Sequence, residues 1–272
     1  MIEINKIYNE DCLLTMGKMP NDFVDLTVTS PPYDNLRNYH GYSFDFKSIS
    51  KELYRVTKNG GVVVWVVGDA TIKGSETGTS FRQALHFKEI GFNLHDTMIY
   101  LKNNFANPAS NRYHQVFEYI FILVKNKLKT FNPIKDRKNI YIGQKAHGKN
   151  RTKDGWRDNT SGETKNEFGM RHNVWKYTTG GGHVSKDKIA YKHPAIFPEE
   201  LVKDHIVSWS NQNDLIYDPF LGSGTTAKMS VLLKRNWIGS EISKEYCDIV
   251  KERLSKLSLS PFQVDDQIGT TT

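Results

Sequence analysis

Two short motifs contain residues whose types and spacing suit group-transfer chemistry. The first, residues 218–225 (Asp-Pro-Phe-Leu-Gly-Ser-Gly-Thr), follows an apolar run at 215–217. Glycines at alternate positions let a turn adopt positive φ and let its backbone approach a ligand closely. A phosphate-binding loop would need a lysine after the second glycine, and Thr225 stands there instead. The spacing also fits the alanine variant of a dinucleotide fingerprint, with Ala227 in third place, so the turn alone leaves the nucleotide open.

An acidic residue supports a ligand that contains adenosine. Glu241 comes directly after the next expected strand, residues 236–240. A carboxylate at the carboxyl end of such a strand suits the two hydroxyls of a ribose. The sequence therefore favours an adenosine-containing cofactor.

The second motif is Ser30-Pro31-Pro32-Tyr33, which follows an expected strand over 22–29. Two prolines fix φ and make the turn stiff. The turn presents a hydroxyl and an aromatic ring at the edge of a sheet, where open α/β sheets bind ligands. Taken alone, the motif also fits an ordinary proline-rich turn.

Together the two motifs resemble those of the amino-methyltransferases of DNA, which use S-adenosyl-L-methionine. These enzymes carry a (Ser/Asp/Asn)-Pro-Pro-(Tyr/Phe/Trp) catalytic motif and a Phe-x-Gly-x-Gly cofactor motif. Here the catalytic motif comes first and a basic segment lies between the two, which resembles the beta-type circular order. Residues 192–201 resemble the family's segment before the cofactor strand, and residues 9–12 resemble its acidic site for the adenine. The resemblance covers about residues 5–255, apart from the basic segment.

The resemblance implies a role for each matched residue. Ser30, Pro31, Pro32 and Tyr33 would hold the target base, and S-adenosyl-L-methionine would be bound with Asp11 at the adenine and Glu241 on the ribose. The full set implied for the cofactor is Asp11, Cys12, Asp218, Pro219, Phe220, Gly222, Gly224, Thr225 and Glu241.

The resemblance implies a site-specific enzyme that methylates the exocyclic N4 amine of a cytosine flipped out of duplex DNA. Ser30 favours cytosine, because a serine is more usual in cytosine-N4 enzymes and an aspartate in adenine-N6 enzymes. Adenine-N6 methylation stays open, as do action on RNA or a small amine and a catalytically inactive DNA-binding protein. Methylation at cytosine carbon 5 would need a cysteine nucleophile, and neither Cys12 nor Cys247 sits in a Pro-Cys turn.

Alternating strand and helix patterns predict the fold. Strands are expected over 22–29, 62–67, 94–101, 116–124, 214–218 and 236–240, and helices over 47–57, 80–90, 198–209, 225–233 and 243–254. The pattern indicates an α/β, doubly wound, mostly parallel sheet covered on both faces. With the resemblance, this is the Rossmann-like methyltransferase type, circularly ordered, with a basic loop-rich insertion.

The basic charge is concentrated in one part of the chain. Residues 125–192 hold 17 of the 37 Lys and Arg but only 6 of the 30 Asp and Glu. Such a segment either is a solvated insertion or contacts DNA phosphates. We expect the latter for Lys145, Lys149, Arg151, Lys153, Arg157 and Arg171.

These features predict a domain organisation and a cellular setting. Residues 1–124 and 190–257 would form the catalytic and cofactor-binding domain, 125–189 a target-recognition region and 258–272 a flexible tail. The expected partner is double-stranded DNA, and a cognate restriction endonuclease acting on the same site is a candidate second partner. Two cysteines, no run of 18 apolar residues and no secretory signal favour a cytoplasmic protein, and no metal site is expected.

Overall fold

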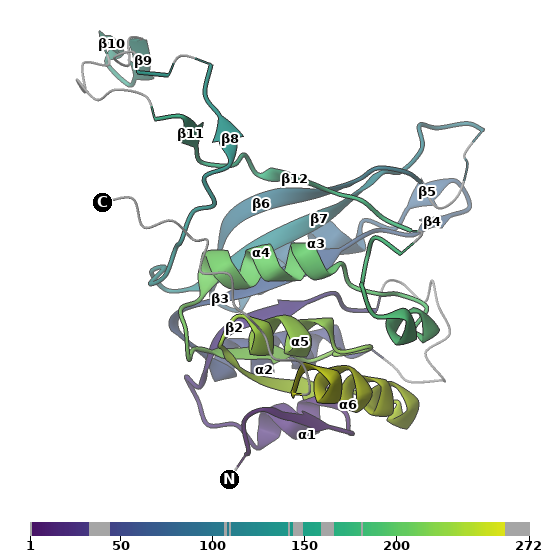
Figure 1. Ribbon diagram of the computed structural model, residues 1–272. Helices are drawn as coiled ribbons and strands as arrows, with labels where there is room; N and C mark the ends of the chain where they lie inside the picture. The colour runs from purple at the N-terminus through teal and green to yellow at the C-terminus, as the bar shows by residue number, and fades with distance from the viewer. Residues whose placement is uncertain are drawn as a thin grey trace.

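Eight strands form the central sheet, in the order β1-β14-β13-β2-β3-β7-β6-β12 (Figure 1). The structure, a computed structural model, describes residues 2–32, 44–105, 108, 110–140, 142–143, 149–158, 166–180 and 182–258. The sheet strands are β1 (Lys6–Tyr8), β2 (Val24–Thr29), β3 (Thr57–Val67), β6 (Phe92–Lys102), β7 (Phe117–Lys125), β12 (Val174–Tyr177), β13 (Leu215–Asp218) and β14 (Asn236–Ser240).

Neighbouring strands are parallel except around β7, which is antiparallel to both β3 and β6. As a result β2, β3, β6, β12, β13 and β14 all end at the same edge, which we call the carboxyl edge. The expected mostly parallel sheet is confirmed. Strands β1 and β12 and the first helix were not expected from the sequence.

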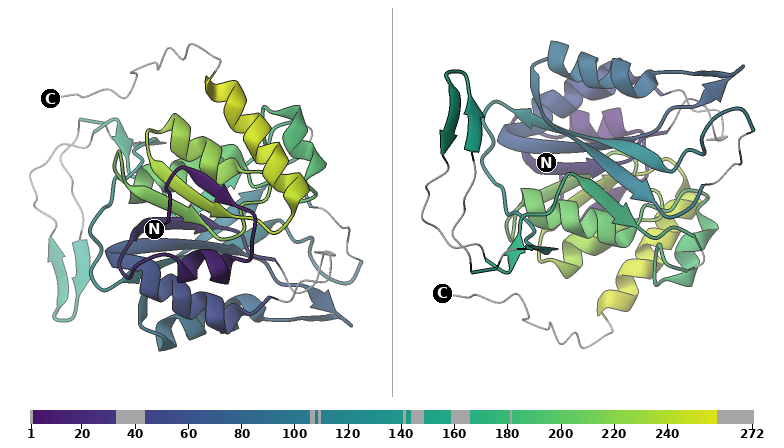
Figure 2. Two further views of the ribbon diagram at one scale, coloured as in Figure 1. Left: turned by 90° about the horizontal axis from the view of Figure 1, so that it is seen from below. Right: turned by 90° about the horizontal axis from the view of Figure 1, so that it is seen from above.

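Helices cover both faces of the sheet, as the doubly wound pattern predicts (Figure 2). One face carries α1 (Cys12–Gly17), α2 (Phe46–Val56) and α3 (Thr79–Glu89), and the other carries α4 (Glu199–Trp209), α5 (Thr225–Leu232) and α6 (Lys244–Ser258), with the 3-10 helix η1 (Lys188–Lys192) beside α6.

The β3 strand explains why both faces need helices. Side chains alternate along a strand, and Val63, Trp65 and Val67 lie in the cluster with α1, α2 and α3. Val62, Val64 and Val66 lie in the opposite cluster, with α4 and α5. A run that is apolar at every position must therefore be covered on both sides.

The α2 helix and β3 meet earlier than expected. The helix ends at Val56, and Thr57 already pairs with Val24 of β2. The register then shifts, so that Val62 pairs with Leu26. Residues 58–61 lie in this irregular part of the ladder and belong to β3, which the sequence had predicted to begin only at residue 62.

The basic region 125–189 is not one structural unit. Its β12 segment pairs with β6 in the main sheet, while the short antiparallel pairs β8 (Arg137–Lys138) with β11 (Phe168–Gly169) and β9 (Lys149–Thr152) with β10 (Gly155–Asp158) lie outside that sheet. We call these two pairs the ribbon. Figures 1 and 2 show the ribbon projecting on the side opposite the hairpin of β4 (Thr71–Ile72) and β5 (Ser75–Glu76), which follows the end of β3 at the carboxyl edge.

Among the described residues, no helix is long and apolar enough to cross a membrane.

Candidate active site at the carboxyl edge

The two sequence motifs lie side by side, although they are almost 190 positions apart. They follow β2 and β13, which are parallel neighbours with Leu26 paired to Ile216 and Thr27 to Tyr217. Ser30-Pro31-Pro32 and the 219–224 turn therefore leave adjacent strand ends at the carboxyl edge. Ser30 and Pro32 are half-buried and Pro31 is buried, while Tyr33 lies outside the described residues.

Asp218 joins the ends of these two strands. Its carboxylate is buried and accepts hydrogen bonds from Thr29 Oγ1 at 2.7 Å, Thr226 Oγ1 at 2.7 Å and the Phe220 amide at 3.0 Å. Burial raises the pKa of this carboxyl to about 6, against the effect of these hydrogen bonds. The Asp218 side chain thus connects the end of β2, the start of the turn and the first residues of α5.

The glycine turn has the backbone conformation that its sequence predicts. Gly222 and Gly224 have φ of +52° and +83°, in the left-handed region that favours glycine. A Cβ atom at position 224 would come within 2.7 Å of Val250 on α6, so a glycine is needed there for packing as well. Gly224 is also the residue that precedes α5, and Thr225 is its first residue.

The carboxylate of Glu241 lies directly behind this turn. Its Oε2 accepts a hydrogen bond from the Gly222 amide and its Oε1 one from the Ser243 amide, both at 2.8 Å. Burial raises the pKa of this carboxyl, and the two amides act in the opposite direction. Each carboxylate oxygen can accept more than one hydrogen bond, so this placement is compatible with two further donors such as ribose hydroxyls.

The N-terminal acidic site is brought to the same place. The Asn9 side-chain amide donates to the carbonyls of Glu241 and Ile242, at 2.9 Å each. Two residues later Asp11 caps α1, where its Oδ1 accepts from the Leu13 amide at 2.7 Å, and Cys12 is buried behind it. Asp11 and Glu241 thus follow the ends of β1 and β14, which are parallel neighbours in the sheet.

An aromatic cluster that the sequence reasoning did not connect with the site supports Phe220. The Phe220 ring is 5.6 Å from the Phe44 ring and 6.4 Å from the Trp65 ring, both in edge-to-face arrangements. Such pairs add to the stability gained from burial. The second residue of the Pro-Phe pair therefore anchors the turn to the core.

Two further loops at the carboxyl edge were also missed. Arg112, between β6 and β7, donates to the Gly74 carbonyl of the β4–β5 hairpin at 2.5 Å. Thr179, just after β12, donates through its amide to Asn103 Oδ1 at 2.8 Å, just after β6. Next to Arg112, Tyr113 is 98% exposed. No sequence motif marks these loops, because only the strand order reveals that they share one edge.

The predicted DNA-binding residues fall into three groups. Arg151 and Lys153 are exposed on the ribbon, close to Trp156, which is 68% exposed. The backbone of Lys149 and of Arg157 lies in β9 and β10, and Lys145 lies outside the described residues.

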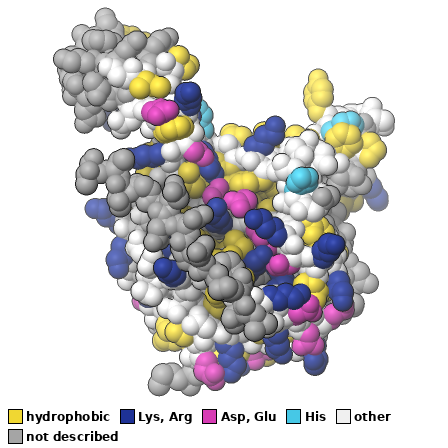
Figure 3. Space-filling model, viewed as in Figure 1, with side chains coloured by type: hydrophobic (Ala, Val, Ile, Leu, Met, Phe, Trp, Pro, Cys, Tyr) yellow, Lys and Arg dark blue, Asp and Glu magenta, His cyan; other side chains and the backbone are white. Residues whose placement is uncertain are grey.

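Arg171 forms the third group, because its guanidinium is paired within the protein. It contacts the Asp136 carboxylate and donates to Asp204 Oδ2 of α4 at 2.6 Å. These ion pairs attach the base of the ribbon to α4, so a phosphate contact from Arg171 is not favoured. Figure 3 shows Lys and Arg side chains interspersed with Asp and Glu on the face drawn, without one continuous cationic patch over its described part.

The glycine turn and the carboxylates beside it suit a nucleoside cofactor. Positive φ at Gly222 and Gly224 gives the tight turn after β13, and Asp11 and Glu241 supply acceptors beside it. Within the described ranges, no group of three or more His, Cys, Asp and Glu residues is placed to hold a metal ion.

Comparison with known proteins gives one consistent result. Residues 24–252 match the family described as DNA methylase. The chain is similar to the orphan methyltransferase M.BamHII of Bacillus amyloliquefaciens, with 61% identity over 85% of this chain and 88% of that protein. It is also similar to the type II methyltransferase M.BglII of Bacillus subtilis, with 29% identity over 93% of this chain and 69% of that protein.

Solved structures share the fold. The cytosine-N4-specific PvuII DNA methyltransferase matches with a TM-score of 0.67 and 20% identity, over 97% of this chain and 88% of that one. The Thermus thermophilus protein TTHA0409, named a putative DNA modification methylase and solved in complex with S-adenosyl-L-methionine, matches with a TM-score of 0.62 and 19% identity, over 92% of this chain and 93% of that one.

Proposed function

The chain belongs to the DNA methylase family, and on this premise we propose that it transfers a methyl group to the N4 amine of cytosine in duplex DNA. The single observation that carries the proposal is the adjacency of the Ser30-Pro31 and Gly222–Gly224 turns at one sheet edge. Base and cofactor can meet there, because the two turns leave neighbouring strands.

The cofactor is S-adenosyl-L-methionine, which when bound supplies a methyl group on a positively charged sulfur. Gly222 and Gly224 provide the close backbone approach, Glu241 accepts from the ribose and Asp11 lies at the adenine. Support comes from the fit of these residues and from the relative solved with this cofactor.

Ser30 and Pro31 orient the amine that is methylated. The exocyclic amine of a base is a poor nucleophile, because its lone pair is delocalised into the ring. Hydrogen bonds from its N–H groups to Ser30 Oγ and the Pro31 carbonyl favour a pyramidal nitrogen and direct the lone pair. Most of the rate enhancement then comes from positioning.

The target base must leave the helix for this contact to form. An amine inside a duplex is out of reach of a turn at a sheet edge, so we propose that the base is flipped out and stacked on Tyr33. Unstacking costs a few kcal/mol, and stacking on an aromatic ring returns roughly 1–3 kcal/mol.

Cytosine is favoured over adenine by the neutral hydroxyl of Ser30 at the first motif position. The cytosine-N4-specific fold relative supports this choice, whereas relatives of the family include an adenine methyltransferase of Escherichia coli. Adenine-N6 methylation is therefore the alternative. Carbon-5 methylation is opposed by the cysteines, since burial raises the pKa of Cys12 to about 12 and that of Cys247 to about 11, which disfavours the thiolate.

For DNA contact we propose the ribbon, with Arg151, Lys153 and the cations at 145, 149 and 157. Two-stranded ribbons fit a DNA groove, and exposed cations with an exposed tryptophan suit a phosphate-lined surface. A restriction endonuclease acting on the same site is a further partner in the cytoplasm. The type II names of relatives support it, while the orphan name of the 61% identical relative opposes it.

Analysis of the modified nucleoside tests the function. The purified protein is incubated with duplex DNA and S-adenosyl-L-methionine, and the DNA is digested to nucleosides that are separated and identified by mass. We expect N4-methylcytosine, and its loss in the S30A variant. Detection of N6-methyladenine in place of N4-methylcytosine would support adenine-N6 methylation, the alternative. DNA that stays unmodified with every substrate sequence would contradict the activity.

A further inference from the structure

A network of four buried or half-buried charges lies directly behind the glycine turn. It consists of Arg253 on α6, Lys228 on α5, Glu199 at the start of α4 and Asp187 just before η1. The Arg253 side chain is fully buried, and those of Lys228 and Glu199 are at most 10% exposed. Two cations face two carboxylates, so the network is neutral at pH 7. Burial acts to raise the pKa of Asp187, but hydrogen bonds from Lys228 and Arg253 lower it on balance.

Arg253 uses all three nitrogens of its guanidinium. Nη1 donates to the Ser223 carbonyl at 2.5 Å, between the two turn glycines. Nε donates to Asp187 Oδ2 at 2.9 Å and Nη2 to Glu199 Oε1 at 2.8 Å. One planar side chain thus joins the turn to the segment 185–199.

Lys228 shares the carboxylates but not the turn. Its ammonium donates to Asp187 at 2.9 Å and to Glu199 at 2.8 Å. The hydrogen bond to the Ser223 carbonyl in the turn comes from Arg253 and not from Lys228. This difference separates the loss of an ion pair from the loss of a contact to the turn.

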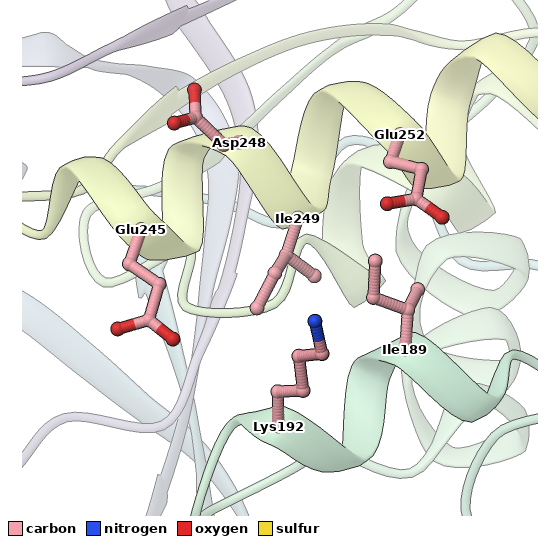
Figure 4. A pocket seen from close by; sticks show the side chains of 6 residues that line it. All are labelled: Ile189, Lys192, Glu245, Asp248, Ile249 and Glu252. Carbon is pink, nitrogen blue, oxygen red and sulfur yellow. The ribbon is translucent and has the colours of Figure 1, made fainter.

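The segment 185–199 also borders the glycine turn, because a Cβ atom at position 222 would lie 3.0 Å from His193 Nε2. The His193 ring packs edge-to-face on Tyr246 of α6, with 4.4 Å between ring centroids. Beside the network, a pocket of about 190 Å³ separates η1 from α6 (Figure 4). Ile189 and Lys192 line it on one side, and Glu245, Asp248, Ile249 and Glu252 line it on the other. Next to this pocket, the hydrogen bonds of Arg253 to Asp187 and Glu199 connect α6 with the 185–199 segment.

We propose that Arg253 is a positioning residue of the cofactor site, which holds the backbone of the Gly222–Gly224 turn and fixes the 185–199 segment to it. This inference rests on the proposed function, since it takes the turn to bind S-adenosyl-L-methionine. Arginine is required, because its rigid fork reaches three partners at once. Lysine keeps the charge but has a single nitrogen.

Cofactor affinity without DNA tests the proposal, with R253K compared to the matched control K228M. Losing a charge-assisted hydrogen bond to the turn is expected to weaken binding of S-adenosyl-L-methionine at least about tenfold in R253K, measured by equilibrium dialysis. K228M removes ion pairs to the same carboxylates and is expected to lower the melting temperature, yet to change this affinity less than about threefold. With saturating cofactor and DNA, kcat of R253K should recover to near the wild-type value.

Hydrogen exchange provides a second readout in the cofactor-free protein. Peptides covering residues 219–226 should exchange faster in R253K than in wild type and K228M. If R253K does not fold, D187N takes its place, because it removes a charged partner of Arg253 at a more exposed position. Faster exchange of the same peptides is again expected.

The outcomes separate the two proposals. Wild-type protein that does not bind S-adenosyl-L-methionine contradicts the proposed function. Wild-type binding that R253K matches, or equal weakening in R253K and K228M, contradicts the role of Arg253 and leaves the function intact. Hydrogen exchange of peptides 219–226 that is the same in R253K and wild type would also contradict the role of Arg253.

Discussion

The imidazole of His193 lies against Gly222, so close that a Cβ atom at position 222 would come within 3.0 Å of His193 Nε2. The 185–199 segment and the glycine turn thus meet without space for a side chain. The positive φ of Gly222 adds to this restriction, because other residues rarely adopt it.

We therefore expect G222D to abolish binding of S-adenosyl-L-methionine. The new carboxylate would collide with His193 and would lie beside the carboxylate of Glu241. Calorimetric titration with the cofactor measures the loss. Gly74 is the matched control, since it has a φ of +82° but open space around it. G74D should bind the cofactor normally, and a G222D protein with wild-type affinity would refute the assignment of the turn.

Tyr33 is expected to act on the base and not on the cofactor. Y33A should lower kcat by about tenfold or more, since stacking of a base on an aromatic ring contributes roughly 1–3 kcal/mol. The affinity for S-adenosyl-L-methionine should stay close to that of wild type, and Y33F should retain most of the turnover. Steady-state kinetics and cofactor titration provide both values. A parallel loss of turnover and cofactor affinity in Y33A would point to misfolding instead.

Asp218 gives the stability a pH dependence of defined sign. Burial raises its pKa from 3.8 to about 6, so the folded protein binds this proton more tightly than the unfolded chain. The stabilisation is fully present below about pH 4 and is lost as the pH rises through 6, by about 3 kcal/mol in total. The free energy of unfolding of wild type minus that of D218N should therefore decrease between pH 5 and 7.

Denaturant unfolding across this pH range measures the effect. Asp248 is a control of opposite sign, because a hydrogen bond from Lys244 lowers the pKa of this exposed carboxyl. A difference between wild type and D218N that is constant or grows with pH would contradict the raised pKa of Asp218.

The ribbon cations are expected to set the salt dependence of DNA binding. Replacing Arg151, Lys153 and Arg157 by glutamine should make the slope of log K against log salt shallower by about 2 to 3 units, if each contacts a phosphate. The same change at Lys244, Lys251 and Lys256, which are exposed on α6, should leave the slope near the wild-type value. Fluorescence anisotropy at several salt concentrations gives the slopes. An unaltered slope in the ribbon variant would contradict the DNA contact and would indicate that the ribbon is a solvated insertion.

Local sequence patterns predicted most of the strands and helices that position the site. The run Val62–Val67 indicated a strand buried on both faces, and both motifs were expected at strand ends. What the sequence could not show depends on contacts between distant segments. The Arg112 and Thr179 contacts follow from strand order, and Arg253 looks like any surface arginine of a helix until its partners from residues 185–223 fold around it.

The basic segment shows a second limit. Charge counting treated residues 125–192 as one region, whereas Val174–Tyr177 is a sheet strand and Arg171 is held by Asp136 and Asp204. Composition cannot distinguish a cation that is neutralised inside the protein from one that faces solvent. The partner carboxylates of Arg171 are 33 and 35 positions away, beyond any local pattern.

The narrow base of the ribbon makes it a separable module. Lys138 pairs with Phe168 and Arg137 with Gly169, so the chain leaves and re-enters the body of the protein at neighbouring points. Everything beyond that ladder can be lengthened, shortened or exchanged without moving the strands that end at Ser30 and Pro219. With the DNA contact proposed for the ribbon, exchanging this module would change the target preference and leave the chemistry at the carboxyl edge in place.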